Sequence, residues 1–228
     1  MKILKGVGDF VVITPKGELK RQLLVIEMAG RVCYQSLKGA ISAESSAAFI
    51  RMLLKRGHES PLEHSAVTIK FVGCSRGFTH ELVRHRLASY NQESTRYVDE
   101  SDARFVVPPH RDENTPITLD DGREMSLSEM LAEEERFYRA LKQSGWPPED
   151  ARQVLPIATR AEIVVTANFR EWRHIFEMRT QKAAHWEIRS VMCRLLIELK
   201  KLVPAVFDDF TLQGTDKNGV PFFAKGKS

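Results

Sequence analysis

Residues 160–168 read RAEIVVTAN, a short run in which every second side chain is apolar. The apolar positions are Ala161, Ile163, Val165 and Ala167. Successive side chains of an extended chain point to opposite faces, so these four share one face. Residues 65–72, SAVTIKFV, show the same alternation, with Val67, Ile69 and Phe71 on one face. The sequence therefore predicts two half-buried strands.

Helical spacing of apolar residues marks the segments around these strands. Residues 18–30 and 43–56 are predicted helices, and Gly57 stands where a helix C-cap is wanted. Residues 78–87 are moderately helical, with Phe78, Leu82 and Val83 facing inward. On this prediction, the arginines that follow lie near the end of a helix, and Asn91 lies in the loop beyond it.

Two longer helices are predicted further along the chain. Residues 126–144 begin with Ser126 and Glu129 in the spacing of a capping box. Their apolar stripe is Leu127, Met130, Leu131, Phe137, Tyr138 and Leu141. A second long helix ends near Pro204, and its stripe is Ile188, Val191, Met192, Leu195, Leu199 and Leu202. The tail from about residue 214 is polar and glycine-rich, and we expect it to be loosely held.

These elements indicate one α/β (α+β) domain over residues 1–228. We expect a central sheet flanked by several helices, including the long C-terminal one. The 228 residues suffice for one large domain with a real core, and 43% hydrophobic with 28% charged residues is typical of a globular protein. The net charge of +4 is too small by itself to argue for a nucleic-acid partner.

The sequence gives no indication of a cysteine-based site, a metal site, a signal peptide or a membrane span. The three cysteines, Cys33, Cys74 and Cys193, form no CxxC pair. In HESPLEH (58–64), Pro61 prevents a regular helix from aligning the two histidines as metal ligands, so we expect no metal. No apolar stretch is long enough for a signal peptide or a membrane span, so we expect a cytoplasmic protein without membrane contact.

Residues 84–97, RHRLASYNQESTRY, concentrate hydrogen-bonding capacity. Arginine forks match a phosphate or carboxylate bidentately, and hydroxyls and amides supply directional bonds to a polar ring. The run therefore favours an anionic small molecule or, as the alternative, a nucleic-acid backbone. The alternative would make the protein a basic nucleic-acid-binding module, but the chain has few clustered aromatic residues for base stacking.

A family resemblance separates these interpretations. Arg84-His85-Arg86, seven residues, then Ser94-Thr95-Arg96 resembles the RHR-x7-SxR signature of the flavin-dependent thymidylate synthases. KRGHESPLEH (55–64), ANFREWRHIFEMR (167–179) and AAHWEIR (183–189) resemble further blocks of that family, in the same order. Together the blocks cover most of residues 25–205.

The resemblance implies an enzyme that methylates dUMP reductively to dTMP. Methylenetetrahydrofolate is the implied carbon donor, and FAD relays a hydride from NADPH, so the folate product is tetrahydrofolate. It also implies a homotetramer with active sites between subunits, without nucleic acid. No enzyme cysteine attacks the pyrimidine in this family, which agrees with the contexts of the three cysteines here.

The resemblance also assigns ligand contacts by position. The implied flavin contacts are His58, Ser60, Arg84, His85, Arg86, Asn91, Gln92, Asn168, Phe169, Arg170 and His174. The implied dUMP contacts are Glu81, Leu82, Val83, Arg84, Gln92, Glu93, Ser94, Thr95, Arg96, Arg152 and Arg179. Arg179 matches the arginine that polarises the uracil and favours ionisation at N3. A permanent cation beside the ring stabilises the anion that makes C5 nucleophilic.

Two positions depart from the family pattern. Some relatives have glutamate where Gln92 stands, which changes the charge at that contact. Some have histidine at the position of Ala183, and here the nearest histidine is His185. The sequence leaves open which ring, if any, packs on the flavin from that side.

Overall fold

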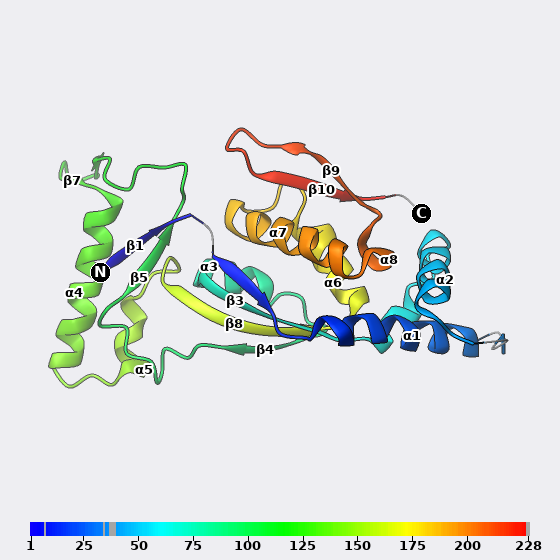
Figure 1. Ribbon diagram of the computed structural model, residues 1–228. Helices are drawn as coiled ribbons and strands as arrows, with labels where there is room; N and C mark the ends of the chain where they lie inside the picture. The colour runs from blue at the N-terminus through cyan, green and yellow to red at the C-terminus, as the bar shows by residue number, and fades with distance from the viewer. Residues whose placement is uncertain (7, 34, 37–39, 227–228) are drawn as a thin grey trace. The chain divides into compact units, whose positions relative to one another are not determined.

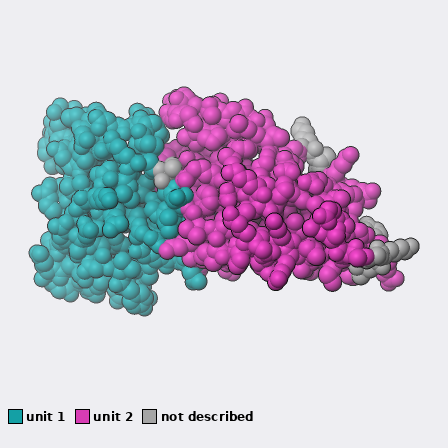
Figure 2. All heavy atoms as spheres, in the orientation of Figure 1, with its two compact units in different colours: residues 1–9, 71–82, 91–163 teal, residues 10–70, 83–90, 164–228 magenta. Residues whose placement is uncertain are grey.

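The computed structural model describes residues 1–6, 8–33, 35–36 and 40–226. The chain forms two compact units, which are coloured separately in Figure 2. Unit 1 comprises residues 1–9, 71–82 and 91–163, and unit 2 comprises residues 10–70, 83–90 and 164–228. Each unit is therefore assembled from three separate stretches, and each is described by itself. The assignment of the whole chain to one domain stays a prediction.

A four-stranded sheet confirms both strands predicted from alternation. Its order is β2 (Asp9–Val12), β3 (Val67–Ser75), β8 (Arg160–Ala167) and β4 (Ala88–Gln92), as Figure 1 shows. Every second residue of β8 is buried, as its sequence predicts. The placement of Asn91 in a loop is wrong, because it lies on β4. That strand reads ASYNQ, and its polar composition hides the alternation.

Unit 1 is built around a parallel strand pair and one long helix. Strand β1 (Lys2–Lys5) pairs with β5 (Arg104–Val107), and α4 (Leu127–Gln143) packs against them. The buried cluster that results is Ala103, Phe105, Val107 and Leu131. The smaller elements are α3 (Arg76–Leu82), β6 (Ile117–Thr118), β7 (Glu124–Met125), α5 (Pro148–Ala151) and the 3₁₀ helix Arg152–Val154.

Helix α4 confirms its predicted start and corrects part of its predicted face. The Ser126 hydroxyl accepts from the Glu129 amide, and the Glu129 carboxylate accepts from the Ser126 amide at 2.7 Å. Leu131 and Tyr138 are buried, but Phe137 is 57% exposed. At 3.6 residues per turn Phe137 lies about 120° from Leu131, which is outside the core-facing stripe. Val83 was also predicted to face inward and is exposed, because α3 ends at Leu82.

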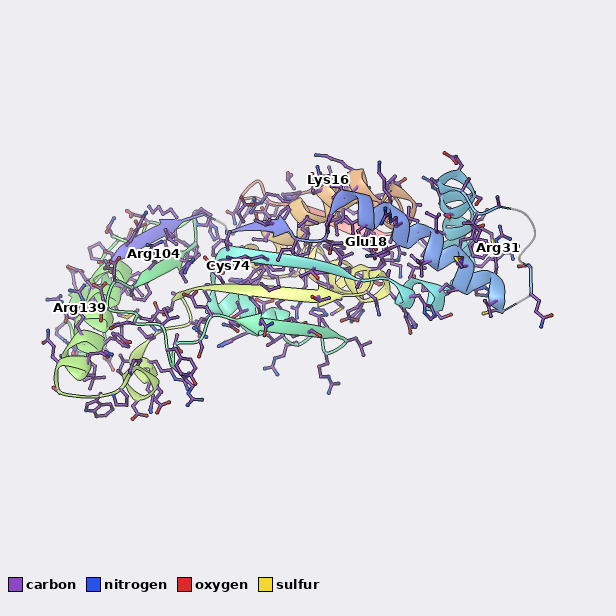
Figure 3. The ribbon with its side chains drawn as sticks, turned by 60° about the horizontal axis from the view of Figure 1, so that its bottom comes forward. Lys16, Glu18, Arg31, Cys74, Arg104 and Arg139 are labelled. Atoms are coloured by element: carbon purple, nitrogen blue, oxygen red, sulfur yellow. The ribbon has the colours of Figure 1, made fainter. Side chains whose placement is uncertain are left out.

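The amino-terminal part of unit 2 is a pair of packed helices, α1 (Lys16–Val32) and α2 (Ala43–Lys55). A Cβ at Gly30 would lie 2.6 Å from the Phe49 ring, so the contact between the helices requires glycine there. Glu18 in the first turn of α1 and Arg31 in its last turn complement the helix dipole (Figure 3).

The carboxyl-terminal part of unit 2 has an aromatic core. Helices α6 (Phe169–Arg179), α7 (Trp186–Leu202) and α8 (Pro204–Phe207) surround it. Its rings include Phe169, Trp172, Phe176, Phe207 and Phe210. Helix α7 confirms the predicted long C-terminal helix. Between α2 and β3 the chain forms the 3₁₀ helix Ser60–His64.

The expectation of a loosely held tail is corrected by a hairpin. Strands β9 (Phe210–Thr215) and β10 (Pro221–Lys225) pair antiparallel, and β10 contacts α7 (Figure 1). Phe210 and Phe223 are buried, so this segment contributes to the core despite its polar, glycine-rich appearance. Among the described residues, no helix combines the length and the apolar character needed to cross a membrane.

Candidate active site

His85 is the buried centre of a polar cluster in unit 2. Arg179, the last residue of α6, donates from Nε to the His85 Nε2 atom over 2.9 Å. The Nδ1 atom of His85 lies 3.7 Å from the Glu171 carboxylate, and the His174 ring centre is 5.6 Å away. The Tyr90 hydroxyl donates to the His85 carbonyl at 2.5 Å. His85 and Glu171 are buried, at 6% and 5% exposure, whereas Arg179 and Tyr90 are half-buried and His174 is exposed.

The environment of His85 fixes its protonation state. Burial, assisted by the charges of Arg179 and His174, lowers the pKa of His85 from 6.5 to about 4. The imidazole is therefore neutral at pH 7. Since Nε2 accepts from Arg179, the ring proton resides on Nδ1, toward Glu171. Burial likewise raises the pKa of Glu171, and burial together with the Glu171 charge raises the pKa of Tyr90 to about 12.

The turn from β8 into α6 positions one side of this cluster. The Asn168 side chain caps α6 by accepting from the Glu171 amide at 2.8 Å. Helical spacing then places Glu171 and His174 on the same face, since residues three apart are neighbours on a helix. Arg170 points to an exposed position and pairs with Glu63.

A cavity of about 680 Å³ in unit 2 is lined by part of this cluster, namely Glu171 and His174, and not by His85 or Arg179. Its lining includes Glu59, Leu87, Asn168, Arg170, His174 and Lys225. The volume lies within the range of small-molecule sites. Three residues that the resemblance assigns to the flavin, Asn168, Arg170 and His174, thus meet at one cavity.

The other implied flavin contacts of unit 2 differ in accessibility. His58, Ser60, Arg84 and Arg86 are exposed. Phe169 is fully buried, with its ring 5.8 Å from that of Phe207 and edge-on to it. Its side chain therefore belongs to the core in this conformation.

In unit 1, the residues expected to hold dUMP are joined by hydrogen bonds. Arg152 donates to the Thr95 hydroxyl at 3.3 Å, and the Arg96 amide donates to the Ser94 hydroxyl at 3.3 Å. The Arg96 guanidinium pairs with Glu149 at 2.9 Å, and both side chains are about half exposed. A solvent-exposed pair of this kind is weak, so an incoming phosphate can replace the carboxylate.

Two neighbouring side chains of unit 1 already have protein partners. The Glu93 carboxylate accepts from Arg160 at 3.1 Å and from the Glu162 amide at 3.1 Å. The Gln92 amide donates to the Thr79 hydroxyl at 3.0 Å. Of the remaining implied contacts in unit 1, Asn91 is exposed, Glu81 is half-buried and Leu82 is fully buried. Arg84, Val83 and Arg179 belong to unit 2.

Comparison with known proteins identifies the family. The family model described as "Thymidylate synthase complementing protein" matches residues 18–205. The flavin-dependent thymidylate synthase of Mycobacterium tuberculosis strain H37Rv is 40% identical over 196 residues, which are 82% of this chain and 78% of that protein. The enzyme of the same name from Mycobacterium avium strain 104 is 40% identical over 198 residues, or 82% and 79% of the two chains. The chain belongs to the flavin-dependent thymidylate synthase family.

A solved structure supports the fold of this family member. A UMP/dUMP methylase from Streptomyces cacaoi, bound with 5-Br dUMP, matches with a TM-score of 0.68. The match covers 91% of this chain and 96% of that one, at 23% sequence identity. At this identity the likeness concerns the fold, which is the mixed arrangement of helices and sheet described above.

The cavity of unit 2 offers cationic, apolar and polar groups to the flavin that the family name specifies, beside the carboxylates of Glu59, Glu63, Glu171 and Glu177. Arg170 offers a guanidinium to a flavin phosphate, because its pair with Glu63 is about half exposed and therefore weak. Lys225 is paired with Glu59 at 2.9 Å and with Glu177 at 3.5 Å. Leu87 offers apolar surface for a flat ring, and Asn168 and His174 offer polar atoms for its edge. The Asn168 cap uses only its Oδ1 atom, so its amide nitrogen remains a donor for a ligand.

Sequence reasoning missed Glu171, Glu59 and Lys225 as residues of this family member's cavity. Glu171 lies three residues before His174, so helical spacing could have found it. Glu59 lies within HESPLEH (58–64), the motif that the sequence analysis rejects as a metal site. Lys225 lies in the tail that was expected to be loosely held, and no spacing along the chain connects it to α6.

Proposed function

We propose that this protein converts dUMP to dTMP by reductive methylation. Methylenetetrahydrofolate donates the carbon, NADPH is the reductant, and tetrahydrofolate leaves as the folate product. Membership of the family supports this reaction, as do the printed names of the relatives and of the dUMP methylase with the similar fold. The observation that carries the proposal is the hydrogen bond from Arg179 to His85, the central residue of the RHR motif.

Arg179 is the proposed catalytic residue. Its guanidinium lies against the uracil and stabilises the negative charge that develops when N3 ionises. A cation that is already in place stabilises the developing charge effectively, because no solvent or side chain has to reorient during the reaction. The hydrogen bond from its Nε to His85 fixes one edge of the guanidinium, which keeps the planar group in one orientation.

His85 supports Arg179 because it is neutral. A protonated imidazole would have no lone pair for Arg179 and would repel it. The low pKa of His85 therefore maintains the hydrogen bond at physiological pH. Burial, the largest cause of that low pKa, comes from the packing that withdraws the His85 ring from water.

The residues of unit 1 bind the nucleotide. Arg96 and Arg152 provide two guanidinium groups for the phosphate, and Ser94 and Thr95 provide hydroxyls. Arginine suits this task because its donors match a phosphate bidentately. Ser94 acts as a binding residue, because neither Thr95 nor Arg96 can serve as the base that a serine nucleophile requires.

FAD is the proposed resident cofactor. When bound, it supplies the hydride-transfer chemistry between NADPH and the folate-derived carbon. The residues of unit 2 that would hold it are His58, Ser60, Arg84, His85, Arg86, Asn168, Phe169, Arg170 and His174. Asn91 and Gln92 on β4 are the further proposed contacts. The chain's own tasks are to bind and orient these groups and to exclude water.

The protein assembles as a homotetramer with its active sites between subunits, in the cytoplasm. Unit 2 carries surface suited to such an assembly, because α1 exposes an apolar stripe. Val25 is 46% exposed, Met28 52% and Val32 64%. These residues follow helical spacing on the side opposite to the buried Leu19, Leu23 and Ile26.

The proposal is tested by the absorption spectrum of the purified protein. We expect a yellow protein that releases FAD on denaturation and whose flavin spectrum changes when dUMP is added. A colourless protein that neither retains nor binds added FAD would contradict the proposed function.

A further inference from the structure

The chain beyond the family match reaches the cavity of unit 2. The match ends at residue 205, and the hairpin β9–β10 lies entirely after it. Lys225, the last residue of β10, nevertheless lines the cavity together with Asn168, Arg170 and His174. The contacts of this C-terminal segment (residues 206–225) with the cavity walls suggest a role in shaping the site.

The first contact joins the end of the hairpin to the turn before Ser60. The Lys225 Nζ atom lies 2.9 Å from the Glu59 Oε1 atom, and both side chains are largely withdrawn from solvent, at 23% and 17% exposure. Burial alone would raise the pKa of Glu59, but the Lys225 hydrogen bond and the Arg173 charge outweigh it and lower that pKa. Glu59 is therefore ionised, and it stands between His58 and Ser60.

The second contact joins the segment to helix α6. Asp209 accepts two hydrogen bonds from Arg173, at 2.7 and 2.6 Å, and the Val206 carbonyl accepts another. Arg173 is buried, with 1% exposure, and its Nη2 atom lies 3.4 Å from the Glu59 carboxylate. Glu59 is thus contacted by Lys225 from the hairpin and by Arg173 from α6.

A third contact reaches the end of α6. The Phe223 amide of β10 donates to the Thr180 carbonyl at 2.9 Å. Thr180 is the C-cap of α6 and directly follows Arg179. The same strand therefore contacts the helix end that carries Arg179 and, through Lys225, the turn that carries His58 and Ser60.

We propose that Lys225 is a positioning residue for the flavin site, acting through its ion pair with Glu59 to fix the 57–60 turn against α6. The role of the cavity as a flavin site rests on the proposed function. The positioning of the turn itself is a property of the protein without cofactor. Two measurements can therefore separate the two claims.

The first measurement is amide hydrogen exchange of residues 57–60 in the apoprotein. Lys225→Met keeps the length of the side chain and removes its charge. We expect about tenfold faster exchange in this turn, with the exchange of α7 unchanged, and Lys225→Arg should restore the slow rate. Lys217→Met is the matched control, because Lys217 is exposed on the same hairpin and forms no ion pair among the described residues. Unchanged exchange in Lys225→Met would overturn the proposal, even if the wild-type protein bound no flavin.

The second measurement is FAD affinity, from quenching of flavin fluorescence. Lys225→Met should bind FAD about tenfold more weakly than wild type, and Glu59→Gln should weaken binding similarly. Both substitutions remove the Lys225–Glu59 pair, while Lys225→Met also removes the 3.5 Å contact with Glu177 and Glu59→Gln also weakens the contact with Arg173. The effect of the double variant should therefore fall short of the sum of the two single effects. Full additivity of the two effects, or wild-type affinity in Lys225→Met, would contradict the positioning role. Failure of the wild-type protein to bind FAD would instead contradict the proposed function.

Discussion

For Arg179, a structural role and a catalytic role predict clearly different effects of substitution. A surface arginine at a helix end would only complement the dipole, at a few tenths to about 1 kcal/mol of stability. Arg179 instead contacts a buried, neutral histidine. We therefore expect Arg179→Ala to retain its fold and FAD and to lose roughly a hundredfold or more in the rate of dTMP formation.

Arg179→Lys is the informative companion variant. Lysine keeps the charge but lacks the planar fork that donates to His85 while presenting further N–H groups. We expect poor activity and weakened dUMP binding, as for the alanine variant, from steady-state kinetics and dUMP titration. Turnover close to wild type in Arg179→Ala would remove Arg179 from the catalytic machinery.

His85 predicts a pH dependence of stability. Its folded pKa of about 4 lies below its unfolded value of 6.5, so between these values the unfolded state binds a proton that the folded state does not. The free energy of unfolding therefore falls as the pH drops from about 6.5 towards 4, by up to about 3 kcal/mol from this group.

The contribution of His85 can be isolated by difference. His85→Gln offers Arg179 an acceptor that does not titrate. Urea unfolding of both proteins between pH 4 and 8 should show a stability difference that shifts in favour of the variant as the pH falls below 6.5. Parallel curves over this range would mean that His85 is not buried in the neutral form.

At the scale of elements, the strands and helices with strong periodicity were predictable. β8, β3, α1, α4 and α7 have apolar residues at periods that only one kind of element satisfies. Strand β4 was not predictable, because ASYNQ is mostly polar and shows no apolar alternation. The hairpin was missed because its burial depends on α7 and α6, which are distant in sequence.

In the candidate site, too, local motifs were predictable from the sequence and contacts between distant residues were not. The motif residues Arg84, His85 and Arg86 were found from the sequence, because their spacing resembles a known signature. The hydrogen bond between His85 and Arg179 joins residues 94 positions apart, and no local pattern specifies such a contact. Glu59 and Lys225 are further still from each other in sequence, and only the folded chain shows that they pair.

The burial of each cysteine predicts the reactivity of its thiol. Cys193 is fully buried on α7, and burial raises the pKa of its thiol to about 12. Cys74 is also buried, whereas Cys33 is exposed. We expect iodoacetamide at pH 8 to label Cys33 alone in the folded protein, because a thiol is reactive only as an accessible thiolate.

None of the three cysteines should be needed for turnover. The variant Cys33→Ala/Cys74→Ala/Cys193→Ala should be less stable, since it leaves small voids at two buried positions. It should still form dTMP in dUMP methylation assays. Complete inactivity of a folded, flavin-loaded triple variant would show that a cysteine takes part in the chemistry.

At the scale of the whole molecule, the exposed stripe of α1 predicts assembly. Val25→Glu places a charge in the middle of that stripe, where burial against another subunit would leave it unpaired. We expect the proposed tetramer to dissociate into smaller species, measured by light scattering during size-exclusion chromatography. Lys20→Glu is the control on another face of α1, and it should keep the mass of the wild-type protein. A Val25→Glu variant of unchanged mass would exclude this stripe from the interface.

The central claim is that the protein makes dTMP by a flavin-dependent reductive methylation. Its most direct test is one anaerobic turnover, in which protein carrying reduced FAD is mixed with dUMP and methylenetetrahydrofolate and the products are quantified. We predict one dTMP, one tetrahydrofolate and one oxidised flavin for each active site. Dihydrofolate appearing in step with dTMP, with the flavin still reduced, would contradict the account.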